Sequence, residues 1–174
     1  MDEESLELDV VQLSKKHNRT IFSCGNAELD RYIREQARQD SNKYCARPFV
    51  LIDKNDDTRI IGYHTLSSAI VVLTDLPSEL TKKFPRYPII PATLLGRLAV
   101  EQQFQGRKLG TILFMHALEQ ALKSSITLAS AVVIVDAKDS GAVGFYKRFG
   151  FKPIMDQPLR LYKPMIDITK QFSL

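Results

Sequence analysis

A short polar run with two glycines, residues 105–110 (QGRKLG), connects an apolar segment to a long amphipathic one that begins at Thr111. The first turn of a helix presents backbone N–H groups without intrahelical acceptors, and it carries a partial positive charge. Glycine lets an anion approach such a backbone closely, and Arg107 and Lys108 add full charges at the same place. The run therefore predicts a binding site for a phosphate or pyrophosphate group; the alternative is a helix cap that binds no ligand.

Two common phosphate-binding sequences do not fit this run. A P-loop requires G-x-x-x-x-G-K-[ST], whereas Gly110 is followed directly by Thr111, and the dinucleotide fingerprint G-x-G-x-x-G is absent from the chain. The run instead resembles the pyrophosphate-binding loop Q/R-x-x-G-x-G/A of the GNAT N-acetyltransferases, with Lys108 in place of its first glycine. That lysine costs energy if its backbone requires a positive φ; otherwise its ammonium is available to bind a coenzyme A phosphate.

A second motif follows about 40 residues later, after the apolar segment 131–137. Residues 144–151 (GFYKRFGF) are similar to the helix-to-strand signature Y-x-x-x-G-F of the same family. By this resemblance, Tyr146 is the catalytic tyrosine that reaches the thioester sulfur. Asp139 stands where many relatives have an asparagine that contacts the pantetheine arm. The alternative for Tyr146 is an amphipathic tyrosine that only packs in the core.

The resemblance implies the GNAT acyltransferase fold in a single domain, residues 1–174. This is an α+β fold with a mixed, mostly antiparallel sheet of about six to seven strands, a splayed central parallel pair and flanking helices. It implies acetyl-CoA as the cosubstrate, with no metal. The residues that it places against acetyl-CoA are Leu98, Ala99, Val100, Gln105, Gly106, Arg107, Lys108, Leu109, Gly110, Thr111 and Asp139. The backbone N–H groups of the first three are expected to stabilise the developing oxyanion.

Four short segments narrow the resemblance: residues 22–25 (FSCG), 62–63 (GY), 95–100 (LGRLAV) and 145–146 (FY). They are similar to the acetyltransferase toxins of bacterial type II toxin–antitoxin pairs, over about residues 20–166. This implies acetylation of the α-amino group of aminoacyl-tRNA, which blocks translation, a ribbon-helix-helix antitoxin as partner, and a homodimer. Two alternatives stay open: an N-acetyltransferase of a small amine or peptide N-terminus, and a catalytically silent CoA-binding module.

The charge distribution agrees with a nucleic-acid substrate. Residues 1–9 contain five acids, and the rest of the chain carries 24 basic and 15 acidic side chains, a net charge of +9. Such a basic body favours a polyanion; the alternative is an ordinary solubilising surface. The basic residues expected to hold tRNA phosphates are Arg97, Arg86, Lys82 and Lys83.

The acceptor must present a neutral amine. A lysine side chain has a pKa near ~10.4, whereas an α-amino group titrates near ~7.7–8.0 and is already partly neutral. The nearby acidic candidate for a general base is Glu101, which is interpreted as a solvated strand terminus. Without a convincing base, an α-amino acceptor is favoured over a protein lysine.

Composition excludes several other classes. The chain has 174 residues and 44% hydrophobic content, which is typical of one globular domain. Two cysteines are too few for a disulfide scaffold, the three histidines have no metal-binding spacing, and no run reaches the ~18 apolar residues of a membrane span. The acidic start is not a signal peptide, so the expected location is the cytoplasm, without a membrane partner.

Periodicity predicts the elements that position these motifs. Asn26 and either Asp139 or Ser140 are expected to cap helices, and Gly150 is expected to follow the end of the second of these. The expected strands are 6–13, 47–53, 59–73, 93–101, 131–137, 151–155 and 159–165, and two further helices are expected over 77–84 and about 107–123.

Overall fold

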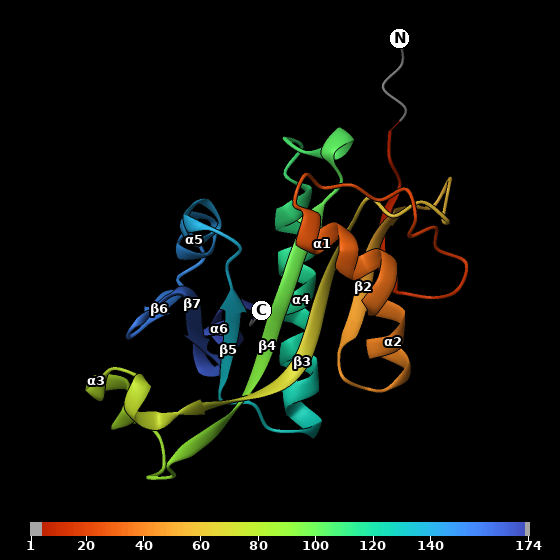
Figure 1. The fold of residues 1–174 in the computed structure, drawn as a ribbon. Helices are drawn as coiled ribbons and strands as arrows, with labels where there is room; N and C mark the ends of the chain where they lie inside the picture. The colour runs from red at the N-terminus through yellow and green to blue at the C-terminus, as the bar shows by residue number, and fades with distance from the viewer. Residues whose placement is uncertain (1–4, 173–174) are drawn as a thin grey trace. The chain divides into compact units, whose positions relative to one another are not determined.

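The computed structural model describes residues 5–172 (Figure 1). Asp2, Glu3 and Glu4, three of the acids counted at the N-terminus, lie outside the described residues. The elements in chain order are β1 (Leu8–Gln12), α1 (Ala27–Arg31), a π-helical turn (Tyr32–Gln36), α2 (Ala37–Asn42), β2 (Arg47–Asp53), β3 (Gly62–Val72), a 3₁₀ turn (Leu73–Asp75), α3 (Ser78–Thr81), β4 (Ile89–Val100), a 3₁₀ turn (Gln102–Phe104), α4 (Leu109–Thr127), β5 (Val132–Asp136), α5 (Ser140–Lys147), β6 (Lys152–Ile154), β7 (Gln157–Pro164) and α6 (Met165–Phe172).

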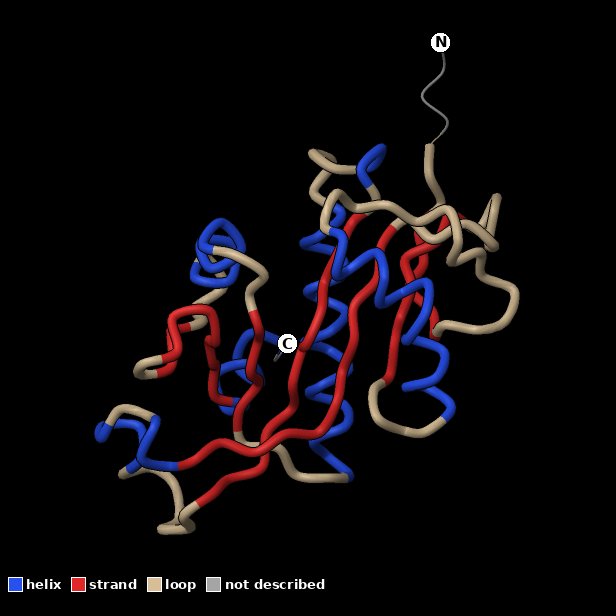
Figure 2. The backbone as a smooth tube through the Cα atoms, in the orientation of Figure 1, coloured by secondary structure: helices blue, strands red, loops and turns tan. Residues whose placement is uncertain are grey.

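The strands form one mixed sheet in the order β1-β2-β3-β4-β5-β7-β6 (Figure 2). β1 pairs with β2, and β7 pairs with both β5 and β6, in antiparallel ladders. β4 and β5 are parallel; their ladder joins residues 92–95 to residues 132–135, and β4 continues to Val100. The expected α+β fold with a mixed sheet and a central parallel pair is confirmed.

The chain divides into two compact units. The first contains the residues up to Thr65 together with Arg97–Ala117, and the second contains Leu66–Gly96 together with the residues from Leu118 onward. β3, β4 and α4 each continue from one unit into the other. The polar run 105–110 belongs to the first unit and Tyr146 to the second, so the two halves of the expected site are described separately.

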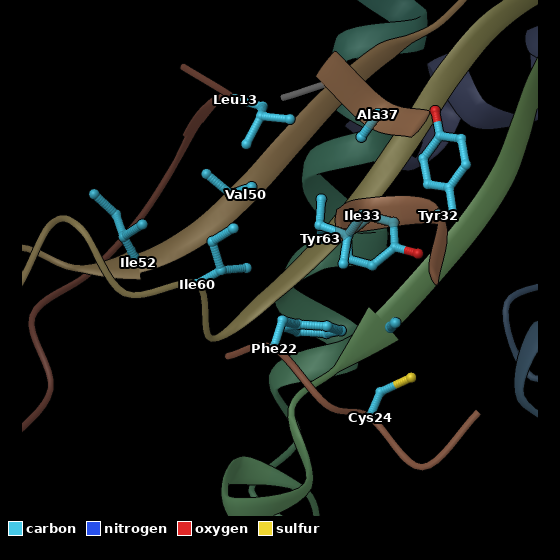
Figure 3. Packing of buried hydrophobic residues seen from close by; sticks show 11 residues of the cluster. Leu13, Phe22, Cys24, Tyr32, Ile33, Ala37, Val50, Ile52, Ile60 and Tyr63 are labelled. Atoms are coloured by element: carbon cyan, nitrogen blue, oxygen red, sulfur yellow. The ribbon is translucent and has the colours of Figure 1, made fainter. Parts of the chain in front are cut away.

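In the first unit, alternate residues of β2 face opposite sides of the sheet, as a strand requires. Val50 and Ile52 pack in one cluster with Tyr32, Ile33 and other side chains of the helical segment 27–42 (Figure 3). Between them in sequence, Leu51 packs in another cluster with Leu109 and Leu113 of α4. The helical segment 27–42 therefore covers one face of β2, and the start of α4 covers the other.

In the second unit, β5 is buried throughout residues 132–135, as expected for a central strand covered on both faces. Val132 and Ile134 pack with Ile90, Ala92 and Tyr162 from the neighbouring strands. The carboxylate of Asp139 accepts a hydrogen bond from the N–H of Ala142, so the predicted helix cap is confirmed. This cap sets the start of α5, the helix that carries Tyr146.

One expected strand boundary was wrong, and two features of the structure were not predicted. The strand predicted to start at residue 93 begins at Ile89, because Ile90 and Ala92 are buried against β5 in a segment whose prolines suggested irregular structure. The helix that starts after Asn26 contains a π-helical turn. After β7 the structure has α6, which was not predicted and whose Met165 and Ile168 are buried at helical spacing. Among the described residues, no helix is long and apolar enough to cross a membrane.

Gly62 makes a close approach that a side chain would block. A Cβ at this position would lie 2.7 Å from Leu113 Cδ1 and 2.8 Å from the carbonyl oxygen of Ala99. We expect Gly62→Ala to lower the free energy of unfolding by about 1–3 kcal/mol, the usual cost of overpacking. Urea denaturation measures this, and Gly144→Ala is the matched control because a Cβ there meets nothing within 4 Å. Equal midpoints for the two variants would contradict the prediction.

Candidate functional site

The run 105–110 presents unpaired backbone donors at the start of α4. Within the described chain, no protein acceptor receives a hydrogen bond from the backbone N–H groups of residues 106–110. Gly106 has a φ of 80°, and no atom would lie within 4 Å of a Cβ built on it. Open space over unpaired donors at a helix start is the environment that an anionic diphosphate requires. The residues present therefore fit the pyrophosphate of the expected cosubstrate.

Lys108 adopts the conformation in which a lysine is strained. Its φ is 61°, in the left-handed region that glycine adopts without penalty. This decides one of the alternatives left open by the sequence: the turn does require a positive φ, so Lys108 costs energy where the family pattern has glycine. Its side chain is exposed, and a phosphate contact remains compatible with this backbone.

We expect Lys108→Gly to raise the free energy of unfolding by about 1 kcal/mol, because it relieves the left-handed strain. Asp156→Gly is the matched control, since Asp156 also has a positive φ, of 62°, and lies outside the run. Urea denaturation of both variants tests the backbone effect, and isothermal titration with acetyl-CoA tests the ammonium. If acetyl-CoA binds more weakly to Lys108→Gly but not to Asp156→Gly, the lysine contacts a phosphate. If Lys108→Gly is no more stable than the wild type, the prediction of backbone strain is wrong.

Gln105 anchors the run to the rest of the first unit. Its side-chain Nε2 donates to the carbonyl oxygens of Cys24 and Val100, both at 2.9 Å. The turn that contains Cys24 also approaches the 3₁₀ turn before the run, because a Cβ on Gly25 would lie 2.9 Å from Gln102 Nε2. Gln105 therefore fixes the start of the run against the end of β4, which is a structural role beside the expected cofactor contact.

Glu101 is buried, and the expectation of a solvated strand terminus was wrong. Its side chain is only 9% exposed. Its Oε2 accepts a hydrogen bond from the N–H of Gln103 at 3.0 Å and lies 3.9 Å from Arg59 Nη2. The carboxylate caps the 3₁₀ turn that leads into the run, which the sequence did not indicate because the turn forms only after β4 ends. Its hydrogen bond to the backbone makes it a poor candidate for a general base.

In the second unit, Tyr146 lies on α5 and is 5% exposed. Burial raises the pKa of its phenol far above the usual range, and the nearby carboxylate of Asp136 raises it further. Tyr146 is therefore a neutral hydrogen-bond donor at physiological pH. Asp136 is itself held by Arg160, whose Nε and Nη2 donate to the two carboxylate oxygens at 2.8 and 3.0 Å. Asp139 uses its Oδ1 as the cap of α5.

The basic residues expected to hold phosphates differ in how firmly they are placed. In the first unit, the guanidinium carbon of Arg97 lies 3.6 Å from the ring centroid of Tyr32. The hydroxyl of Tyr32 donates to Asp40 Oδ2 at 2.9 Å, which fixes the ring under Arg97. In the second unit, Lys82, Lys83 and Arg86 are exposed on the segment after α3.

A histidine pair that sequence spacing did not reveal lies in the core of the first unit. His64 Nε2 and His116 Nδ1 are 2.9 Å apart, although 52 positions separate the two residues. Phe49 stacks on His64 with ring centroids 5.0 Å apart. Over residues 5–172, no group of three or more His, Cys, Asp or Glu side chains could hold a metal ion.

Comparison with known protein families and sequences gives one consistent result. The sequence model of the acetyltransferase (GNAT) family matches residues 13–151. A protein from Mycobacterium tuberculosis named tRNA-acetylating toxin is 31% identical over 156 residues, which cover 90% of this chain and 91% of that protein. A protein from Sinorhizobium fredii named probable toxin TacT is 27% identical over 160 residues, or 88% of either chain.

Solved structures resemble the whole fold. The structure of AtaT complexed with acetyl-methionyl-tRNAfMet superposes with a TM-score of 0.88 at 26% identity, covering 95% of this chain and 99% of that chain. The structure of AtaTR bound with AcCoA superposes with a TM-score of 0.85, also at 26% identity, covering 96% of this chain and 99% of that chain.

Proposed function

This chain belongs to the acetyltransferase (GNAT) family, and from that premise we propose that it transfers the acetyl group of acetyl-CoA to the α-amino group of aminoacyl-tRNA. Acetylated in this way, the aminoacyl group can no longer be used as a nucleophile, so the protein acts as a toxin that blocks translation. The whole chain, residues 1–174, acts as one acetyltransferase domain, consistent with the continuity of β3, β4 and α4 through both compact units.

The unpaired N–H groups of residues 106–110 carry the proposal. In it, they bind the pyrophosphate of acetyl-CoA, together with the charges of Arg107 and Lys108. No atom would lie within 4 Å of a Cβ at Gly106, so a ligand can approach the backbone there. This supports direct contact between the diphosphate and the main chain. Within Leu98, Ala99 and Val100 of β4, the backbone N–H groups that point away from β3 are assigned to the carbonyl oxygen of the thioester, where negative charge develops during attack.

Tyr146 is assigned to the leaving sulfur. When the amine attacks the acetyl carbon and the C–S bond breaks, the thiolate gains negative charge, and the phenol donates a hydrogen bond to it. Complete proton transfer is uphill, because a thiol titrates near ~8.5 whereas the pKa of Tyr146 is raised above the usual tyrosine range. Donation to the forming thiolate is therefore the role that the pKa of this side chain supports.

The acceptor is an α-amino group because the described site offers no available base. Glu101, the acidic residue nearest the run in sequence, is buried and bound to the backbone. An α-amino group titrates near ~7.7–8.0, so a useful fraction is neutral at physiological pH without a base, whereas a lysine near ~10.4 is almost wholly charged. This favours an aminoacyl ester over a protein lysine.

Transfer RNA is the proposed carrier of that amine. The Mycobacterium tuberculosis relative is named for tRNA acetylation, and AtaT has been solved with acetyl-methionyl-tRNAfMet. Contacts from Arg97, Arg86, Lys82 and Lys83 to phosphates would hold the tRNA without reading its sequence. Arg97 is the most firmly placed of these, since Tyr32 lies under its guanidinium.

The direct test incubates the purified protein with acetyl-CoA and charged tRNA and identifies the released aminoacyl group by mass spectrometry. We expect an N-acetylated amino acid from charged tRNA and none from free amino acids or uncharged tRNA. Acetylation of small amines alone, with charged tRNA untouched, would reject the proposal in favour of a small-molecule N-acetyltransferase.

Three further assignments accompany this function: a cytoplasmic location, where aminoacyl-tRNA is used, a homodimeric state, and inhibition by a ribbon-helix-helix antitoxin. The two sequence relatives described above are named as toxins, which supports the search for an antitoxin. Co-expression with the product of the neighbouring gene, followed by size-exclusion chromatography, tests the last two assignments.

A further inference from the structure

Two arginines flank one aromatic ring immediately before the run 105–110. The guanidinium carbons of Arg59 and Arg107 lie 4.9 and 5.5 Å from the ring centroid of Phe104. Phe104 is half-buried and packs against the cluster that contains Leu109. The ring is therefore held by the core, and it gathers two positive charges at the edge of the candidate pyrophosphate site.

Arg59 is held in place by its neighbours and still has donors to offer. Its Nη2 donates to Gln103 Oε1 at 2.7 Å and lies 3.9 Å from the carboxylate of Glu101. A guanidinium has five N–H donors in a fixed fork, and the side chain of Arg59 is 37% exposed. Glu101 offsets part of the charge of Arg59, but Arg59 together with Arg107 and Lys108 of the run leaves a positive excess at residues 106–110.

We propose that Arg59 and Arg107, ordered by Phe104, bind the 3′-phosphate on the adenosine of coenzyme A. The inference rests on the proposed function, because it assumes that the diphosphate of acetyl-CoA lies on residues 106–110. It assigns Arg59 a role that sequence spacing does not suggest, since this residue lies more than 40 positions before the run. Its consequence is selectivity for coenzyme A over the same thioester lacking that phosphate.

The chemistry of the ligand supports this assignment. The unpaired backbone N–H groups and Lys108 face the diphosphate. Each guanidinium has five N–H donors, so Arg107 can add its charge at the diphosphate and still, with Arg59, donate hydrogen bonds to a second anion. In coenzyme A, the 3′-phosphate lies one ribose away from the diphosphate and carries close to two negative charges at neutral pH. Arginine binds such a terminal phosphate through paired N–H donors, and side chains held by existing contacts lose little freedom on binding.

The test compares the binding of acetyl-CoA and acetyl-dephospho-CoA by isothermal titration, with initial rates of acetyl transfer as a second measurement. We expect the wild-type protein to bind acetyl-CoA about 10–100-fold more tightly, the range for hydrogen bonds to a charged group. Arg59→Gln and Arg107→Gln should each reduce this preference by about tenfold. The double variant should bind both compounds with nearly equal affinity.

Arg47→Ala is the matched control. Arg47 also lies over an aromatic ring, with its guanidinium carbon 5.5 Å from the centroid of Tyr44, and its loss should leave the preference unchanged. Arg59→Lys keeps the charge if Arg59→Gln fails to fold, and it should retain part of the preference. Tight binding of both compounds by the wild type, or an unchanged preference in the folded Arg59 and Arg107 variants, would overturn the inference while the proposed function stands. Binding of neither compound would overturn both.

Discussion

Replacing Tyr146 with phenylalanine lowers the rate of acetyl transfer by about 10²–10⁴-fold, the range for a positioned proton donor, while the protein stays folded. The ring remains to fill its place in the core, where Tyr146 is 5% exposed, and only the hydroxyl is lost. Because that hydroxyl is assigned to the leaving sulfur, the loss should appear in kcat, with little change in the Kd for acetyl-CoA. Quenched time courses of acetyl transfer to charged tRNA measure the rate, and isothermal titration with acetyl-CoA measures the Kd.

Tyr162→Phe is the matched control for this prediction. Tyr162 is a buried tyrosine of the same unit, on β7, and burial raises the pKa of its phenol as well. Its variant should retain full activity. A Tyr146→Phe enzyme as fast as the wild type would remove the phenol from the mechanism, and equal losses in both variants would point to a general effect on packing.

We expect acidification to destabilise the folded protein through His64. Burial lowers the pKa of this side chain to about 3, with His116 adding to the effect, from 6.5 in the unfolded chain. Between these two pH values the unfolded chain binds a proton that the folded chain does not, so the free energy of unfolding falls as the pH falls through this window. The free energy of unfolding keeps its full value above about pH 7 and decreases by about 2 kcal/mol between pH 8 and pH 5.

Urea denaturation at a series of pH values tests this dependence. His64→Gln removes the titration and retains an amide that can reach His116, so its unfolding free energy should change less with pH than that of the wild type. His17→Asn is the comparison, because burial also lowers the pKa of His17. This replacement should remove a smaller part of the pH dependence of the unfolding free energy than His64→Gln does. Parallel curves for the wild type and His64→Gln would exclude His64 as the cause.

Many features of the fold were predictable because they depend on local chemistry. The caps at Asn26 and Asp139 are confirmed, because their side-chain oxygens accept hydrogen bonds from backbone N–H groups two or three residues later. The positive φ of Gly150 agrees with its predicted place after α5. The buried run 132–135 and the alternation along β2 follow directly from strand geometry. The short α6 was missed because a helix of two turns carries little periodic signal.

The candidate site was predictable to a similar extent and for a similar reason. The run 105–110 concentrates glycine and positive charge at a helix start, and its unpaired donors follow from that position alone. The spacing did not predict the backbone conformation of Lys108, because its φ of 61° depends on how the run turns into α4. The burial of Glu101 was also missed, because it depends on a 3₁₀ turn and on Arg59, more than 40 positions away.

The sequence by itself determined the acetyltransferase family, the candidate diphosphate-binding run and the candidate tyrosine, because each depends on contiguous motifs whose chemistry is local. Only the tertiary structure decided which distant side chains meet: His64 with His116, Arg97 with Tyr32, and Arg59 with Phe104. Residues that pair across strands and helices share no spacing rule, since their proximity depends on how the chain folds back on itself. Burial is decided in the same way, and it makes His64 neutral and keeps the phenol of Tyr146 protonated.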